Sequence, residues 1–158
     1  MTSDDPLLGQ NLPAFDLPTD GDRRATDADF KGQTLVLYLY PKDDTSGCTK
    51  ESQDFSDRYR DFKAAGAEVV GLSKDGVKSH DKFKAKYGFP FPLLSDEDTT
   101  LISALGSWVE KSMYGRKYMG ADRSTFLIDR DGVIQKVWRK VKVPGHVDDV
   151  LAAVKAMG

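Results

Sequence analysis

The stretch TLVLYLYPKDDTSGCTK, residues 34–50, decides the fold because it changes from an apolar run to a turn and then to a helix start. The run 34–40 is rich in β-forming residues, which is typical of a strand buried on both faces of a sheet. Pro41 ends the strand, and Thr45 and Ser46 are residue types that begin helices. Cys48, the only cysteine in the chain, therefore lies in the first turn of a predicted helix.

The residues after Cys48 have the period of an amphipathic helix that continues to about residue 65. Phe55, Tyr59 and Phe62 recur at i, i+4 and i+7, which places them on one face. Cys48 lies seven residues before Phe55 and so belongs to roughly the same core-facing side. We therefore expect a thiol that is close to the core and also close to a helix N-terminus.

Strands and helices alternate along the rest of the chain. The predicted strands are 68–73, 123–129 and 133–138, with extended edge segments at 12–17 and 89–94, and the predicted helices are 77–87, 98–105 and a last one from 145. Asp131-Gly132 is a hairpin signal, so the last two strands should be antiparallel. The pattern predicts an α/β fold with a mixed central β-sheet flanked by helices.

The region 107–120 has no clear period and is expected to be irregular. It contains Trp108, Met113, Tyr114 and Tyr118, and we interpret these large side chains as part of the core, with a dimer surface or a wall of the hydroperoxide pocket as the alternatives.

Length and composition indicate a single domain over residues 1–158, with residues 1–11 as a loose lead-in. The formal net charge of −2 provides no electrostatic basis for binding nucleic acid or an anionic membrane. The longest apolar run is too short to span a bilayer, and the acidic N-terminus does not resemble a secretory signal. A single cysteine without such a signal predicts a reducing, cytoplasmic location.

Cys48 is either a buried structural residue or a reactive thiolate, and its place at a helix start favours the thiolate. With no second cysteine, Cys-x-x-Cys exchange is excluded. A cysteine hydrolase needs a histidine base. His80, however, lies on the apolar face of a predicted helix and is expected to be a packing residue, and His146 is expected to be solvated or to cap the last helix. No spacing of cysteine and histidine suggests a metal site. Direct attack on an electrophile remains, and peroxide, which would give a sulfenic acid, is the natural candidate.

Residues 38–55, YLYPKDDTSGCTKESQDF, and residues 123–129, RSTFLID, are similar to the signatures of peroxiredoxins. More narrowly, they resemble the bacterioferritin-comigratory-protein, or peroxiredoxin Q, subfamily, and the similarity covers nearly the whole chain. The resemblance implies a thioredoxin-like fold and the thiol-dependent reduction of hydrogen peroxide and organic hydroperoxides, with no cofactor and no metal.

The resemblance also assigns roles to individual residues. Cys48 matches the peroxidatic cysteine, Thr45 the threonine that hydrogen-bonds the thiolate and the peroxide, and Pro41 the proline that shields the pocket. Arg123 matches the arginine that pairs with the sulfur and polarises the O–O bond. Glu51 matches a recurrent supporting glutamate, which either orients the arginine or favours the first helical turn.

The chain departs from the subfamily at two positions, Ser46, where proline is usual, and Gln53, where many relatives have a resolving cysteine. We expect little effect from Ser46, because serine can cap a helix. Gln53 predicts a one-cysteine variant whose sulfenic acid is reduced by an external thiol, namely glutathione, glutaredoxin or thioredoxin, or by a second subunit's Cys48. The expected assembly is a monomer or a weak homodimer. Two alternatives stay open: a non-enzymatic peroxide sensor or redox-regulated binding module, and a catalytically silent interaction protein.

Overall fold

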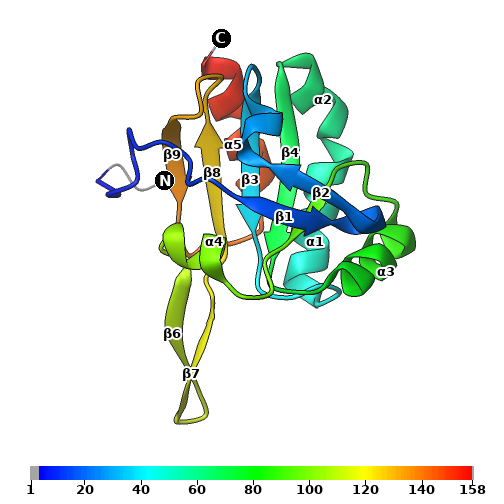
Figure 1. The fold of residues 1–158 in the computed structure, drawn as a ribbon, viewed down its shortest axis with the longest axis vertical. Helices are drawn as coiled ribbons and strands as arrows, with labels where there is room; N and C mark the ends of the chain where they lie inside the picture. Colours follow the sequence, from blue (N-terminus) through cyan, green and yellow to red (C-terminus); the bar gives the residue numbers. More distant parts are fainter. Residues whose placement is uncertain (1–3, 158) are drawn as a thin grey trace.

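The computed structural model describes residues 4–157 and shows a central seven-stranded sheet with helices packed against it (Figure 1). The strands of this sheet are β1 (Asp16–Thr19), β2 (Arg23–Thr26), β3 (Thr34–Leu39), β4 (Ala67–Ser73), β5 (Leu93–Ser95), β8 (Ser124–Ile128) and β9 (Ile134–Trp138). Their order in the sheet is β2-β1-β5-β4-β3-β8-β9. β3 is parallel to β4 and antiparallel to β8, and β8 is antiparallel to β9, so the predicted mixed sheet is confirmed.

The helices largely match the predicted segments. They are α1 (Ser46–Asp57), α2 (Tyr59–Ala64), α3 (Val77–Tyr87), α4 (Thr100–Ala104) and α5 (His146–Ala156), with short 3-10 turns η1 (Asp20–Asp22) and η2 (Asp27–Phe30). Among residues 4–157, no helix combines the length and apolar character needed to cross a bilayer.

β3 is the centre of the fold because both of its faces are buried. Val36 and Tyr38 belong to one core cluster, together with side chains of α1, α2 and α5. Leu35 and Leu37 belong to a second cluster on the other face, which α4 and the N-terminal segment cover. This alternation explains why the segment is apolar at every position rather than at every second one.

The predicted helix 46–65 was wrong in one respect, because the structure divides it into α1 and α2 at Arg58. The Arg58 N–H is shared between the carbonyls of Asp54 and Phe55, which tightens the last turn of α1. The change of direction keeps Phe55 and Phe62 on the same core, with their ring centroids 5.8 Å apart.

The prediction for region 107–120 was also wrong. The segment forms a regular antiparallel hairpin of β6 (Trp108–Met113) and β7 (Arg116–Ala121), which projects away from the main sheet (Figure 1). Tyr114 and Gly115 join the strands with φ values of 51° and 77°, the two positive angles of a type I′ turn. Tyr114, Met113 and Tyr118 are 98%, 56% and 44% exposed, so these side chains are not part of the core. Trp108, at the start of β6, does pack against the second core cluster, as expected.

Residues 4–11 are not loose, while residues 1–3 lie outside the described part of the chain. Buried Asp5 is ion-paired with Arg139, with 2.8 Å between Oδ2 and Nε. The Gly9 N–H donates to the carbonyl of Ile134 in β9. The start of the chain is therefore attached to the edge of the sheet.

Candidate active site

Cys48 is the third residue of α1, directly after the loop that connects the end of β3 to that helix. Its side chain is only 1% exposed and packs in the same core cluster as Phe55, as the helical spacing predicted. Amide N–H groups in a first helical turn lack partners four residues earlier, and the helix dipole is positive there. The backbone around the thiol therefore favours negative charge.

Arg123 reaches the thiol from the position immediately before β8. Its Nη2 lies 3.4 Å from the Cys48 Sγ, and its Nη1 donates to the Glu51 Oε1 at 2.8 Å. The register of the antiparallel β3–β8 pair places Ser124 opposite Leu39, so Arg123 comes next to the end of β3. Sheet pairing thus brings together two residues that are 75 positions apart in the chain.

Glu51 lies one turn after Cys48 and has no exposed surface. Burial raises its pKa to about 7, although the charge and hydrogen bonds of Arg123 act in the opposite direction. Of its two proposed roles, the geometry fits the first, in which the carboxylate orients the Arg123 guanidinium. Within residues 4–157, its second oxygen, Oε2, has no hydrogen-bond partner.

Gly47 was missed by the sequence interpretation. A Cβ atom added to Gly47 would lie 3.0 Å from the Nη2 of Arg123, tighter than nine in ten real Cβ contacts, so the guanidinium would have to shift. The absence of a side chain therefore provides the space in which the guanidinium approaches the thiol. Gly-Cys in the first turn of a helix is the only sequence signal for this.

Thr45 and Pro41 lie in the loop before α1. Thr45 is at the predicted N-cap position, but its hydroxyl donates to the Lys42 carbonyl at 2.9 Å and makes no cap hydrogen bond. In the described residues no hydrogen bond joins Thr45 to Cys48, so its role toward peroxide stays a prediction. Pro41 is half-buried and lines a cavity of about 370 Å³, together with Tyr118 and Met119 of β7.

In the described residues, the ring nitrogens of both histidines have hydrogen-bond partners other than Cys48. The expectation that His146 is solvated was wrong: it is 5% exposed, and its Nε2 lies 2.8 Å from the Thr125 Oγ1. Burial lowers its pKa to about 4, so the ring is neutral near pH 7.

His80 is buried as expected, but it is more than a packing residue. It has no exposed surface, and its Nδ1 lies 2.7 Å from the Asp43 Oδ2 in the loop before α1. The sequence interpretation missed Asp43, because nothing in the spacing of residues 43 and 80 indicates a contact.

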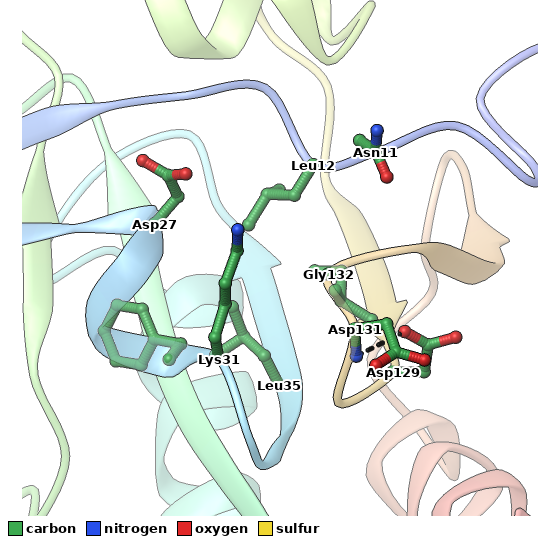
Figure 2. Close-up of a pocket in the computed structure, with 10 residues that line it drawn as sticks. Asn11, Leu12, Asp27, Lys31, Leu35, Asp129, Asp131 and Gly132 are labelled. Atoms are coloured by element: carbon green, nitrogen blue, oxygen red, sulfur yellow. Dashed lines mark hydrogen bonds between the residues drawn. The ribbon is translucent and has the colours of Figure 1, made fainter.

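A second cavity, also of about 370 Å³, is lined by residues that include Leu35, Asp129 and Gly132 (Figure 2). Leu35 is near the start of β3, whereas Cys48 follows the end of that strand, so this cavity lies at the other end of the sheet. The Asp129 carboxylate accepts hydrogen bonds within the β8–β9 turn. Over residues 4–157, no group of three or more His, Cys, Asp or Glu side chains is arranged to hold a metal ion.

Comparisons with known proteins assign the chain to a family. Residues 8–137 match the AhpC/TSA family. The chain is 51% identical over 144 residues to a putative peroxiredoxin bcp of Coxiella burnetii, covering 91% of this chain and 95% of that protein. It is 44% identical over 150 residues to peroxiredoxin Bcp of Bacillus subtilis, with 95% and 96% of the two chains covered.

The fold also matches a solved structure of the Xanthomonas campestris bacterioferritin comigratory protein, which is described in terms of its alkyl peroxide reduction activity. The TM-score is 0.87 and the identity 48%, with 90% of this chain and 91% of the other covered. The similarity confirms the predicted thioredoxin-like peroxiredoxin fold. The chain therefore belongs to the AhpC/TSA family and, within it, to the peroxiredoxins of the Bcp or peroxiredoxin Q type, which makes it a thiol-dependent peroxidase.

Proposed function

We propose that this chain reduces hydrogen peroxide and alkyl hydroperoxides by a one-cysteine route centred on Cys48. The thiolate attacks the terminal oxygen of the hydroperoxide, so that an S–O bond forms while the O–O bond breaks. The leaving oxygen takes a proton and departs as water or an alcohol, and Cys48 becomes a sulfenic acid. The contact between the Arg123 guanidinium and the Cys48 sulfur is the observation that carries this proposal.

In this proposal the surrounding groups stabilise the negative charge that moves from sulfur to oxygen. Arg123 lies beside the sulfur, where its charge favours the thiolate and then the departing oxygen. Glu51 holds the other arm of the guanidinium and prevents it from turning away. Thr45 and Pro41 come from the adjoining loop, where they bind the peroxide and restrict the access of water.

The sulfenic acid is reduced by an external thiol. A first thiol forms a mixed disulfide with Cys48 and releases water, and a second thiol attacks that disulfide and restores the Cys48 thiol. Gln53 is exposed at the position of the usual resolving cysteine, and the chain has no other cysteine to replace it. We propose glutathione with glutaredoxin, or thioredoxin, as the reductant, and a monomer or weak homodimer as the assembly.

Intact mass after one equivalent of hydroperoxide, with and without glutathione or thioredoxin, tests the route. The proposal expects a gain of one oxygen on Cys48, then a glutathione adduct or the unmodified chain. Disulfide-linked chain dimers would instead show that a second subunit provides the resolving thiol. A single stoichiometric oxidation with no turnover, whatever the thiol, would contradict the enzyme and favour the sensor.

Substitutions test the assigned roles in steady-state turnover. Cys48→Ser should abolish turnover. Arg123→Ala should lower kcat/KM for the hydroperoxide by roughly 100-fold, the typical cost of removing one transition-state donor. Thr45→Val should lower it strongly as well. Wild-type rates in Arg123→Ala or Thr45→Val would remove that residue from the mechanism.

A further inference from the structure

A buried polar cluster connects α3 to the loop that precedes Cys48. Asp43, in that loop, is 7% exposed, and His80, in α3, has no exposed surface. The Asp43 carboxylate accepts hydrogen bonds from Tyr40 Oη at 2.6 Å and from Ser79 Oγ at 2.8 Å. The His80 Nδ1 lies 2.7 Å from the same carboxylate. No role proposed so far for this chain uses these groups.

The partners of His80 indicate its protonation state. Its Nε2 lies 2.8 Å from the Leu94 carbonyl oxygen, which can only accept, so this nitrogen carries a hydrogen. Its Nδ1 faces a carboxylate that already accepts from two hydroxyl groups. Both ring nitrogens therefore act as donors, and the ring is an imidazolium paired with a carboxylate.

The charged groups around His80 agree with this state. They are Asp43 from the loop before α1 and Asp75 from the turn before α3, and β5 contributes the Leu94 carbonyl. Burial by itself would lower the pKa of His80. The opposing contributions outweigh burial and raise the pKa above its ordinary value; they are the hydrogen bond and charge of Asp43, the hydrogen bond to the Leu94 carbonyl and the charge of Asp75.

Asp43 is two residues from Pro41 and two from Thr45, so the position of its side chain determines where the loop lies. The Asp43 N–H also donates to the Asp75 Oδ2 at 2.9 Å. The next residue, Asp44, has a φ of 56°, a conformation that non-glycine residues adopt only when their surroundings hold them in it. The loop is therefore shaped by its contacts rather than by its own preference.

We propose that His80 is a positioning residue for the peroxidase reaction: as an imidazolium it holds the Asp43 carboxylate and thereby fixes Pro41 and Thr45 beside Cys48. This inference rests on the proposed role of the loop toward peroxide. If the ring loses a proton, one of its two hydrogen bonds and the ion pair are lost together. The loop then loosens while the thiol itself, in α1, stays in place.

Two variants separate the contacts of the ring. In His80→Asn the amide nitrogen takes the place of Nδ1 and keeps the hydrogen bond to Asp43. In His80→Gln the amide reaches the place of Nε2 and keeps the hydrogen bond to Leu94 instead. We expect His80→Gln to lower kcat/KM for the hydroperoxide roughly tenfold, because small misplacements of catalytic groups are costly, and His80→Asn to lower it much less.

Two further measurements distinguish positioning from a general loss of structure. Alkylation of Cys48 by iodoacetamide, which needs no peroxide pocket, should be about as fast in His80→Gln as in the wild type. Lys86→Ala is the matched control. The Lys86–Asp44 ion pair joins the same loop to α3, but it is exposed and therefore weak, so its removal should leave the hydroperoxide rate close to that of the wild type. Equal losses of hydroperoxide and alkylation rates in His80→Gln would overturn the proposal.

The protonation state can be tested in the unmodified chain, even if the His80 variants do not fold. Two-bond ¹H–¹⁵N spectra of the two histidines should show two ring N–H groups on His80 at pH 7 and one on His146. A neutral His80 ring at pH 7, or a wild-type hydroperoxide rate in His80→Gln, would overturn the inference. A wild-type chain that does not turn over hydroperoxide at all would instead contradict the proposed function.

Discussion

At the scale of single residues, two residues of α1 determine where the Arg123 guanidinium lies: one forms an ion pair with it and the other leaves space for it. Glu51 holds the Nη1 of Arg123 at 2.8 Å, and Gly47 leaves room for the Nη2, which lies 3.4 Å from the Cys48 sulfur. The charge beside the thiol is thus determined by two neighbours in the same helix. One of them is recognisable from the family signature, and the other contributes only by lacking a side chain.

Gly47→Ala tests this arrangement. The new Cβ would push the guanidinium away from Cys48, so kcat/KM for hydroperoxide should fall roughly tenfold, because small misplacements at a reacting centre have large effects on rate. The free energy of unfolding should not decrease along with the rate, since alanine is a better helix former than glycine. Ser46→Ala, at the exposed neighbouring position, is the control and should keep the wild-type rate. An unchanged rate in Gly47→Ala would show that Arg123 need not lie where it does.

At the scale of elements, the β6–β7 hairpin and the N-terminal segment differ most from expectation. Within residues 4–157 the two hairpin strands pair only with each other and extend beyond the main sheet, so the tip cannot bury its large side chains (Figure 1). Residues 4–11 show the reverse, because an ion pair and backbone hydrogen bonds bind a polar segment to β9. In both cases the composition of the segment was a poor guide to its burial.

Tyr114→Asn tests the hairpin. Because Tyr114 is 98% exposed and its φ is positive, asparagine should be tolerated, with a change in the free energy of unfolding within about 0.5 kcal/mol. Trp138→Ala, in β9, is the contrast and should cost about 3 kcal/mol or more, because that ring packs in the core. Chemical denaturation measures both values. A large loss in Tyr114→Asn would mean that the tip is covered in solution.

Asp5→Asn tests the N-terminal attachment. It leaves the half-buried guanidinium of Arg139 without its carboxylate, so we expect a loss of about 2 kcal/mol in the free energy of unfolding. Arg139 lowers the pKa of Asp5 through its hydrogen bond, so this contribution is present above the ordinary pKa and is lost as the pH falls through the lowered one. Asp4→Asn changes an exposed neighbour and should have no effect on denaturation. Equal stabilities of the two variants would contradict the attachment.

At the scale of the whole molecule, two buried titratable groups give the stability opposite dependences on pH. His146 has a pKa of about 4 in the folded chain, below its ordinary value. It therefore lowers the free energy of unfolding increasingly as the pH falls from about 6.5 toward 4. Glu51 has a folded pKa of about 7, above its ordinary value. It therefore lowers the free energy of unfolding increasingly as the pH rises from about 4.5 to 7. Between pH 5 and 7 the two contributions therefore oppose each other.

Two variants separate these contributions in urea denaturation at pH 5 and pH 7. His146→Gln removes a histidine that the fold keeps neutral. Its free energy of unfolding relative to wild type should therefore be about 2 kcal/mol more favourable at pH 5 than at pH 7. Glu51→Gln should show the opposite change, of similar size, because it removes a carboxyl group whose pKa is raised by burial to about 7. Identical pH profiles in all three chains would contradict both shifts.

The sequence by itself determined most of the fold and singled out Cys48 as the candidate reactive residue. A strand apolar at every position, a helix of period 3.6 and an Asp-Gly turn are local patterns, and they predicted β3, the helix start at Cys48 and the β8–β9 hairpin. Local patterns also indicated that Cys48 faces the core. The family signature then added Arg123 and Glu51, which spacing alone could not connect to the thiol.

Only the tertiary structure decided how these residues meet. The Arg123–Cys48 contact depends on the register of β3 with β8, and the His80–Asp43 pair depends on how α3 packs against the loop before α1. The exposure of Tyr114 and the burial of His146 depend on what covers each segment, not on the side chain itself. Local sequence specifies backbone conformation over a few residues, whereas contacts between distant residues follow from strand register and packing, which form only when the whole chain has folded.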